Sequence, residues 1–156
     1  MKKVISVVIA GLGGQGVLKA SDILTDVAFR AGLAVKKSEI HGMSQRGGSV
    51  TSDVRFGREV FSPMVPEGEA DFLVSLAASE IAVNRAVLAP AGIIIGPADV
   101  DESKLANKKS LNVALLGALA RHLDLPEECW QAAILSNLPE KLHEANVQAF
   151  AVGKGS

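Results

Sequence analysis

Apolar and polar residues follow one another along the first half of the chain in a pattern that predicts strands separated by helices. Val4–Ala10 is apolar except at Ser6 and rich in β-branched residues, which is typical of a strand buried on both faces. Val17–Ala31 carries apolar residues at helical spacing, and Gly32 follows where such a helix should end. A turn at Gly57-Arg58 would lead into a short extended segment at Glu59–Phe61. Further strands are expected at Leu33–Ile40, Ser49–Phe56, Asp71–Leu76 and Ile93–Ile95.

The second half is predicted to be mainly helical. Pro97–Lys109 is polar and without period, so we expect irregular structure there, and Gly153–Ser156 should be a frayed end. Strands that alternate with helices indicate a largely parallel sheet between helix layers. We therefore expect one domain over residues 1–156, a Rossmann-like three-layer α/β/α fold whose mostly parallel sheet carries a strand–loop–strand excursion after the second strand. Helices are expected from Ser79 to Leu88 and at Leu111–Leu123, Pro126–Leu135 and Pro139–Phe150.

Acidic and basic residues nearly balance in this chain of 156 residues, which has a net charge of −1. A nucleic-acid surface would need a basic surplus, and base stacking would need aromatic side chains, which make up only 4% of the residues. No apolar run approaches the roughly 20 residues of a membrane span, and Val4–Ala10 fits a first strand better than a signal peptide. We therefore expect a soluble, cytoplasmic protein with neither nucleic-acid nor membrane partners.

The few cysteines and histidines leave little room for metal chemistry within the chain. Cys129 is the only cysteine, so neither an intrachain disulfide nor an iron–sulfur cluster, which needs about four thiolates, can form from this chain's own residues. His41, His122 and His143 are scattered and lack the spacing of zinc ligands. We therefore expect no metal-binding residues, and we interpret Cys129 as a packed small hydrophobe.

A glycine loop, Gly11-Leu-Gly-Gly-Gln-Gly16, lies between the first predicted strand and the first predicted helix. Glycines let the backbone approach a ligand, and unpaired N–H groups at a helix start can bind a phosphate. The pattern alone also fits a turn that merely packs the helix on the sheet. A dinucleotide-binding domain would want an acid at the end of the second strand, and Glu39, beside Lys36 and Lys37, is the only candidate.

A second loop, within Glu39–Ser49, is unusually rich in groups that form hydrogen bonds. It reads Glu-Ile-His-Gly-Met-Ser-Gln-Arg-Gly-Gly-Ser and so offers three glycines, amide and hydroxyl side chains, a histidine and an arginine. Arg46 precedes two glycines, so its guanidinium and nearby backbone N–H groups could together bind an anion. An exposed polar loop without a ligand remains the alternative. His41 could act as an acid or base because its ordinary pKa lies near neutrality, but a structural or subunit-contact role fits equally well.

With these two loops the chain resembles the small (beta) subunit of indolepyruvate ferredoxin oxidoreductase. More broadly, it is similar to the gamma domain of the pyruvate/ketoisovalerate (2-oxoacid):ferredoxin oxidoreductase family. The second loop is the specific motif, whereas the glycine loop alone is not. The resemblance runs from near residue 4 to residue 153. Other matching segments are Pro63–Pro66, Glu69–Asp71, Asn112–Leu119, Pro139–Asn146 and Ala149–Gly153.

The resemblance implies an enzyme that decarboxylates a 2-oxoacid on thiamine diphosphate and passes electrons through iron–sulfur clusters to ferredoxin, releasing an acyl-CoA. Thiamine diphosphate and the clusters would belong to a large partner subunit, and contact with ferredoxin would be indirect. This chain would contribute coenzyme A binding and subunit assembly, and it would be inactive alone, with no catalytic residues of its own. The form that the family motif takes in the second loop, His-Gly-Met-Ser-Gln-Arg-Gly-Gly, favours an aryl-pyruvate such as indolepyruvate as substrate. Carried over residue by residue, the coenzyme A-binding candidates are Gly13, Gly14, Gln15, Gly16, Ser44, Gln45, Arg46, Gly47 and Asn112.

The chain departs from the family pattern between Ile95 and Asn112, where only Gly96–Leu111 replaces a longer excursion with another strand and helix. The sheet would then lose an edge strand, along with any ligand or subunit contact that the excursion makes. Two other functions stay open. A stand-alone dinucleotide-binding domain would bind NAD or NADP, with Glu39 or Lys36 setting the preference. A purely structural subunit would only bury a face of its partner. The isolated chain could also form a homodimer, because a missing partner leaves apolar surface exposed.

Overall fold

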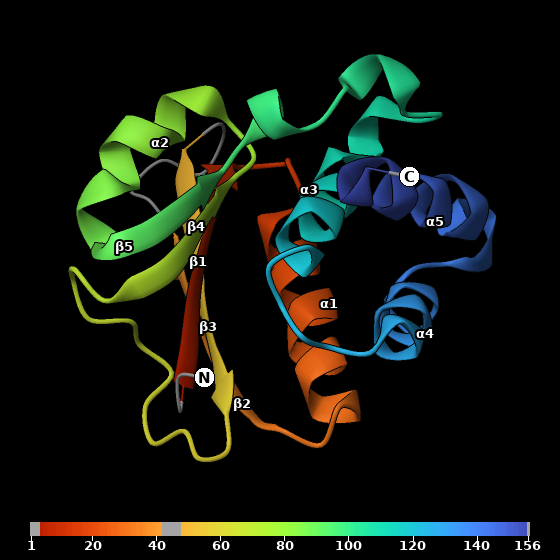
Figure 1. Cartoon of the computed structure of the whole chain (residues 1–156). Coiled ribbons are helices and arrows are strands. Elements are labelled where there is room, and N and C mark those ends of the chain that lie inside the picture. Colours follow the sequence, from red (N-terminus) through yellow and green to blue (C-terminus); the bar gives the residue numbers. More distant parts are fainter. Residues whose placement is uncertain (1–3, 42–47, 156) are drawn as a thin grey trace.

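A five-stranded mixed sheet organises the chain, with the strand order β2-β3-β1-β4-β5 (Figure 1). The structure is a computed structural model, and it describes residues 4–41 and 48–155. The α/β class expected from the sequence is confirmed. The strands are β1 (Val4–Leu12), β2 (Ala34–His41), β3 (Ser49–Gly57), β4 (Ala70–Ser75) and β5 (Leu88–Ile95).

The sheet is less parallel than the sequence predicts. β1 pairs with β4 and β4 with β5 in parallel, whereas β3 is antiparallel to both of its neighbours, β1 and β2. The strand–loop–strand excursion after the second strand is therefore an antiparallel pair, with β3 inserted between β2 and β1. The physical reason is the short connection, because parallel neighbours need a crossover of about a dozen residues or more, whereas antiparallel neighbours do not.

The helices cover the two faces of the sheet unequally. α1, α3, α4 and α5 all lie on one side, and α2 alone lies on the other (Figure 1). None of the helices within the described residues is both long and apolar enough to span a lipid bilayer. The helices are α1 (Val17–Arg30), α2 (Ala78–Asn84), α3 (Leu111–Ala120), α4 (Glu127–Asn137) and α5 (His143–Lys154).

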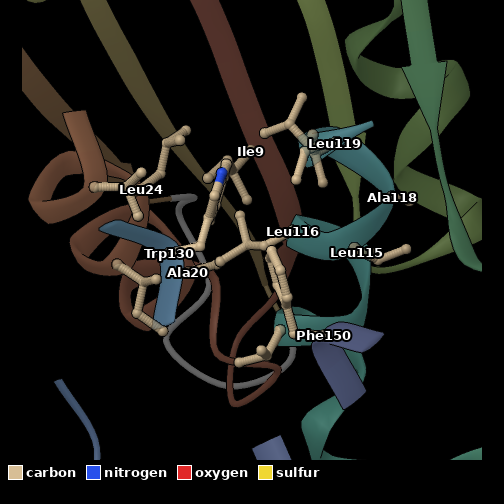
Figure 2. Close-up of a cluster of buried hydrophobic side chains, with 14 of the residues drawn as sticks. Ile9, Ala20, Leu24, Leu115, Leu116, Ala118, Leu119, Trp130 and Phe150 are labelled. Atoms are coloured by element: carbon tan, nitrogen blue, oxygen red, sulfur yellow. The ribbon is translucent and has the colours of Figure 1, made fainter. Parts of the chain in front are cut away.

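Most buried apolar side chains form one core between the sheet and the four helices on its larger covered side. Ile9 of β1 and Leu24 of α1 meet Leu116 of α3 there, and Trp130 and Phe150 close the far side (Figure 2). The ring centroids of Trp130 and Phe150 lie 5.3 Å apart. A smaller cluster on the other face contains Val8, Ala10, Ala70 and Leu73. β1 is thus buried on both faces, as its largely apolar sequence predicts.

The end of the chain is packed helix, so the prediction of a frayed end at Gly153–Ser156 is wrong for its first residues. α5 continues to Lys154 and crosses α3 at two glycines, Gly117 and Gly153. A Cβ added to Gly117 would overlap the Phe150 carbonyl oxygen, and one added to Gly153 would overlap the Ala114 carbonyl oxygen. The two backbones therefore touch directly, which only glycine permits.

Several predicted boundaries also differ. Glu59–Phe61 is not a strand but part of the long connection from β3 to β4. The helix expected up to Leu88 ends at Asn84 and continues as a 3₁₀ turn, Arg85–Val87, before β5 begins. β5 tolerates Pro90 because it is an edge strand, where a missing N–H costs no ladder bond.

The polar stretch Pro97–Lys109 forms short 3₁₀ turns rather than wholly irregular structure. Within it, Val100 and Leu105 are buried in the main core and so tie the stretch to the domain. The turns are Pro97–Asp99, Glu102–Lys104 and Lys108–Ser110.

Candidate functional site

The glycine loop lies at the carboxyl end of β1, where the chain turns into α1. β1 runs through Gly11 and Leu12, and the turn occupies Gly13–Gly16. Gly14 and Gly16 both have a φ of 88°, a left-handed conformation in which a side chain would be strained. Gly13 and Gly14 are exposed, and a Cβ added to Gly14 would meet no atom within 4 Å. The loop therefore presents bare backbone to open space, as a phosphate-binding turn must.

The two predicted loops meet at Gly48. The backbone N–H of Gly13 donates a hydrogen bond of 2.9 Å to the carbonyl oxygen of Gly48, the residue directly before β3. Leu12 pairs with Ser49, so the carboxyl end of β1 and the start of β3 lie side by side at the same end of the sheet. The candidates Ser44, Gln45, Arg46 and Gly47 lie outside the described residues, as does the side chain of His41, and their roles stay predictions.

Gln15, a predicted coenzyme A-binding residue, folds its side chain back onto the backbone. Its Oε1 accepts a hydrogen bond of 2.7 Å from the N–H of Leu12, and its Nε2 donates one of 3.3 Å to the carbonyl oxygen of Leu76. Leu76 follows β4 and donates its own N–H to the Ala10 carbonyl oxygen at 2.8 Å. The Gln15 amide thus joins the glycine loop to the segment between β4 and α2.

Asn112, the remaining predicted site residue, reaches the other end of the loop from α3. Its Nδ2 donates a hydrogen bond of 3.2 Å to the carbonyl oxygen of Gly16, and its Oδ1 accepts one of 2.9 Å from the N–H of Val113. The residue is only 8% exposed. A Cβ on Gly16 would lie 2.6 Å from Asn112 Nδ2, so this contact requires a glycine at position 16. The structure therefore brings Gly13, Gly14, Gln15, Gly16 and Asn112 together.

The surroundings of the loop suit a negatively charged ligand. The first backbone N–H groups of a helix have no partner within the helix, and the helix dipole places partial positive charge there. The first turn of α1 contains no acidic residue that would repel an anion. It does contain Lys19, which is exposed. Lys19 is not among the residues predicted from the sequence, although its position three residues after Gly16 could have indicated it.

The arrangement of β2 argues against a dinucleotide site. Glu39 is on β2, which β3 separates from β1 and its glycine loop. Its carboxylate accepts a hydrogen bond of 2.8 Å from Lys37, which also pairs with Asp22 of α1. Burial would lower the pKa of Lys37, but its bonds with Asp22 and Glu39 outweigh that effect and raise it. The one acid that could bind a ribose is thus held by a lysine two strands away from the loop.

The other reactive side chains have structural surroundings. Cys129 is buried in the main core. Nε2 of His143 lies 2.7 Å from the carbonyl oxygen of Leu138, and the ring centroids of His122 and Phe72 are 5.8 Å apart. Among the described residues, no cluster of histidine, cysteine or carboxylate side chains could hold a metal ion. The glycine loop is therefore the candidate site that the geometry supports.

Two kinds of comparison relate the chain to known proteins by sequence. Residues 6–155 match the family described as pyruvate ferredoxin/flavodoxin oxidoreductase. Indolepyruvate oxidoreductase subunit IorB of Thermococcus kodakarensis is 34% identical, over 95% of this chain and 93% of that protein. The subunit of the same name from Methanothermobacter thermautotrophicus is 30% identical, over 97% of this chain and 96% of its own length.

Solved structures show the same fold. The gamma subunit of keto/oxoacid ferredoxin oxidoreductase from Geobacter sulfurreducens superimposes with a TM-score of 0.73 at 24% identity, covering 96% of this chain and 95% of that one. The 2-oxoglutarate:ferredoxin oxidoreductase of Magnetococcus marinus, with 2-oxoglutarate, coenzyme A and succinyl-CoA bound, gives a TM-score of 0.81 at 19% identity. That match covers 99% of this chain but 31% of the longer one.

The relatives carry additional residues, in keeping with the short Gly96–Leu111 region. The alignment with the Thermococcus subunit spans 188 positions, whereas 95% of this chain's 156 residues is about 148, so about 40 positions have no counterpart here. Apart from that difference, the similarity extends over nearly the whole chain. The chain therefore belongs to the pyruvate ferredoxin/flavodoxin oxidoreductase family, and its sequence relatives there are oxidoreductase subunits that it matches over nearly their whole length.

Proposed function

We propose that this chain supplies the coenzyme A-binding surface of an indolepyruvate-type 2-oxoacid:ferredoxin oxidoreductase. Its sequence relatives are named as indolepyruvate oxidoreductase subunits, which supports an aryl-pyruvate as the substrate of the assembled enzyme. The Magnetococcus enzyme, which contains the same fold, was solved with coenzyme A bound. The proposal places the assembled enzyme in the cytoplasm, as the sequence predicts.

The observation that carries the proposal is the hydrogen bond from Gly13 to Gly48, which joins the two predicted loops at one edge of the sheet. Coenzyme A carries a diphosphate and a further phosphate on its ribose, so its nucleotide end needs an anion-binding surface. Exposed backbone at Gly13 and Gly14, the start of α1 and the ammonium group of Lys19 provide such a surface. Arg46 would add a guanidinium, which binds phosphate through two parallel hydrogen bonds.

Redox chemistry belongs to the partner in this proposal. Thiamine diphosphate stabilises the carbanion that forms when a 2-oxoacid loses carbon dioxide, and iron–sulfur clusters accept the electrons. This chain has one cysteine, too few for a cluster, so the large subunit would hold both groups and would pass electrons on to ferredoxin. The small subunit would bind the nucleotide end of coenzyme A and direct its thiol toward the partner.

A purely structural role is the second candidate, and one observation favours it. The connection from β3 to β4 exposes two large apolar side chains, Phe61 at 85% and Met64 at 55%. Exposed aromatic and methionine side chains are enriched in protein interfaces. Such a surface would serve assembly whether or not the glycine loop binds a ligand, so coenzyme A dependence must be measured directly.

The test uses the complex of this chain with its large subunit. Lys19→Ala and Arg46→Ala should each raise the apparent KM for coenzyme A about tenfold, because a hydrogen bond to a charged group contributes about 1.5 to 3 kcal/mol. The KM for the 2-oxoacid should not change. Lys141, which is also exposed and lies in a 3₁₀ turn outside the site, provides the matched control Lys141→Ala. Intact complexes with an unchanged coenzyme A dependence in both variants would leave only the structural role.

A further inference from the structure

We propose that Gln15 and Asn112 position the glycine loop for coenzyme A and do not themselves contact it. This inference rests on the proposed function and changes the role that the sequence suggests for both residues. Each amide bonds the backbone at one end of Leu12–Gly16, and each uses its oxygen as well as its nitrogen within the protein. The ligand would then contact the backbone between them.

Gln15 holds the start of the loop. If its side chain turned outward to a ligand, the N–H of Leu12 and the carbonyl oxygen of Leu76 would both lose the hydrogen bond that they form with Gln15. Gly11 confirms how closely this side chain is packed, because a Cβ there would lie 3.0 Å from Gln15 Oε1. The amide is therefore enclosed by the backbone that it orders, and an outward rotation would be costly.

Asn112 bonds the end of the loop at Gly16, and its own position is set by α3, to which it belongs. The residue is the second of α3, which follows directly on the 3₁₀ turn Lys108–Ser110, where Asn107 accepts a hydrogen bond of 2.9 Å from the N–H of Lys109. Its amide bonds the carbonyl oxygen of Gly16, the residue before the first turn of α1. This contact fixes the position of the loop relative to the start of α1, whose N–H groups would bind phosphate.

Hydrogen exchange separates positioning from contact, because positioning acts before any ligand binds. The test is to measure amide exchange by mass spectrometry in the complex of the small and large subunits without coenzyme A. Gln15→Ala should speed exchange in peptides covering Leu12–Gly16 about tenfold, because Leu12 loses its acceptor. Gln15→Glu should keep Leu12 protected, since its carboxylate can still accept that bond. Lys19→Ala, a proposed direct contact, should leave exchange in the ligand-free complex unchanged.

Kinetics then separates positioning for coenzyme A from general stability. Gln15→Ala and Asn112→Ala should each raise the KM for coenzyme A about tenfold, while kcat at saturating coenzyme A and the KM for the 2-oxoacid stay at the level of the Lys141→Ala control. If Asn112→Ala lowers the yield of complex, Asn112→Leu replaces it, because it keeps a side chain of similar size, removes the donor to Gly16 and adds no charge near the proposed phosphate site. The Gln15 variants test the inference independently of that outcome.

Two results would overturn the inference. A raised KM with unchanged ligand-free exchange would mean that the side chains bind coenzyme A directly. Faster exchange with an unchanged KM would mean that the bonds only stabilise the fold. Failure of the proposed function is distinguishable from both, because it would appear as an unchanged KM for coenzyme A in Lys19→Ala and Arg46→Ala.

Discussion

Replacing Gly153 by alanine tests whether the close crossing of α3 and α5 is essential to the fold. Considered alone, the substitution should stabilise α5, because alanine is favoured over glycine in a helix interior by about 1 kcal/mol. The structure predicts the opposite sign. The added Cβ would overlap the carbonyl oxygen of Ala114 and lie 2.8 Å from its carbon and 3.0 Å from the Ala118 nitrogen.

All three atoms belong to the backbone of α3, so no side-chain rotation can relieve the overlap. The helices would have to separate, and this would loosen Phe150 against Trp130 in the core beside the crossing. Overpacking a core costs typically 1 to 3 kcal/mol and sometimes more, and the backbone clash places this case at the upper end. After subtraction of the helix-propensity gain, we expect a net loss of about 2 kcal/mol.

Chemical denaturation of the purified chain measures this loss, and a thermal scan should show a fall in Tm of about 4 to 8 °C, from about 2 to 4 °C per kcal/mol at this size. Gly155→Ala is the matched control two residues away. Gly155 has a φ of 87° and no atom within 4 Å of an added Cβ, so its replacement costs only left-handed strain of about 1 to 2 kcal/mol. An unchanged or raised stability of Gly153→Ala would refute the crossing.

Three further results are expected. Asp53 is buried, which raises its pKa, although the N–H of Val65 and the charge of Arg55 oppose the shift. Because the pKa of Asp53 is higher in the folded than in the unfolded chain, its ionised carboxylate lowers the stability of the fold at pH values above the ordinary pKa of 3.8. Asp53→Asn should therefore stabilise the chain at pH 7. Denaturation at a series of pH values should show this gain vanishing below pH 3.8. Phe150→Ala removes a fully buried ring and should cost about 3 to 5 kcal/mol in the same denaturation assay. Calorimetric titration with NAD or NADP should show no binding, because Glu39 is paired with Lys37 away from the loop; micromolar affinity would restore the dinucleotide hypothesis.

Local features of the sequence were sufficient to predict the elements that position the site. The apolar run of β1, the glycines after it and the helical spacing of α1 each follow from the preferences of neighbouring residues. The place of β3 between β2 and β1 could not be predicted in the same way, because it depends on which strands pair at long range. The family resemblance likewise made Gln15 a candidate site residue without indicating that its amide faces inward to Leu12 and Leu76.

The C-terminal residues from Gly153 onward likewise could not be predicted from local sequence alone. Gly153 was interpreted from its position near the end of the chain, where disorder is common, but its function is set by Ala114 of α3. A glycine inside a helix has two opposite explanations, helix termination or close approach of another backbone. Only the position of the other helix decides between them, and that information is not present in the local sequence.

The short Gly96–Leu111 region can be reconciled with an intact site. What the loop needs from the second half of the chain is the start of α3, because Asn112 bonds Gly16 from there. The 3₁₀ turns of this region bring the chain from β5 to that point, with Val100 and Leu105 buried along the way. A longer excursion is therefore not required to place Asn112, and its loss should affect contacts made at the β5 edge of the sheet rather than the support of the glycine loop.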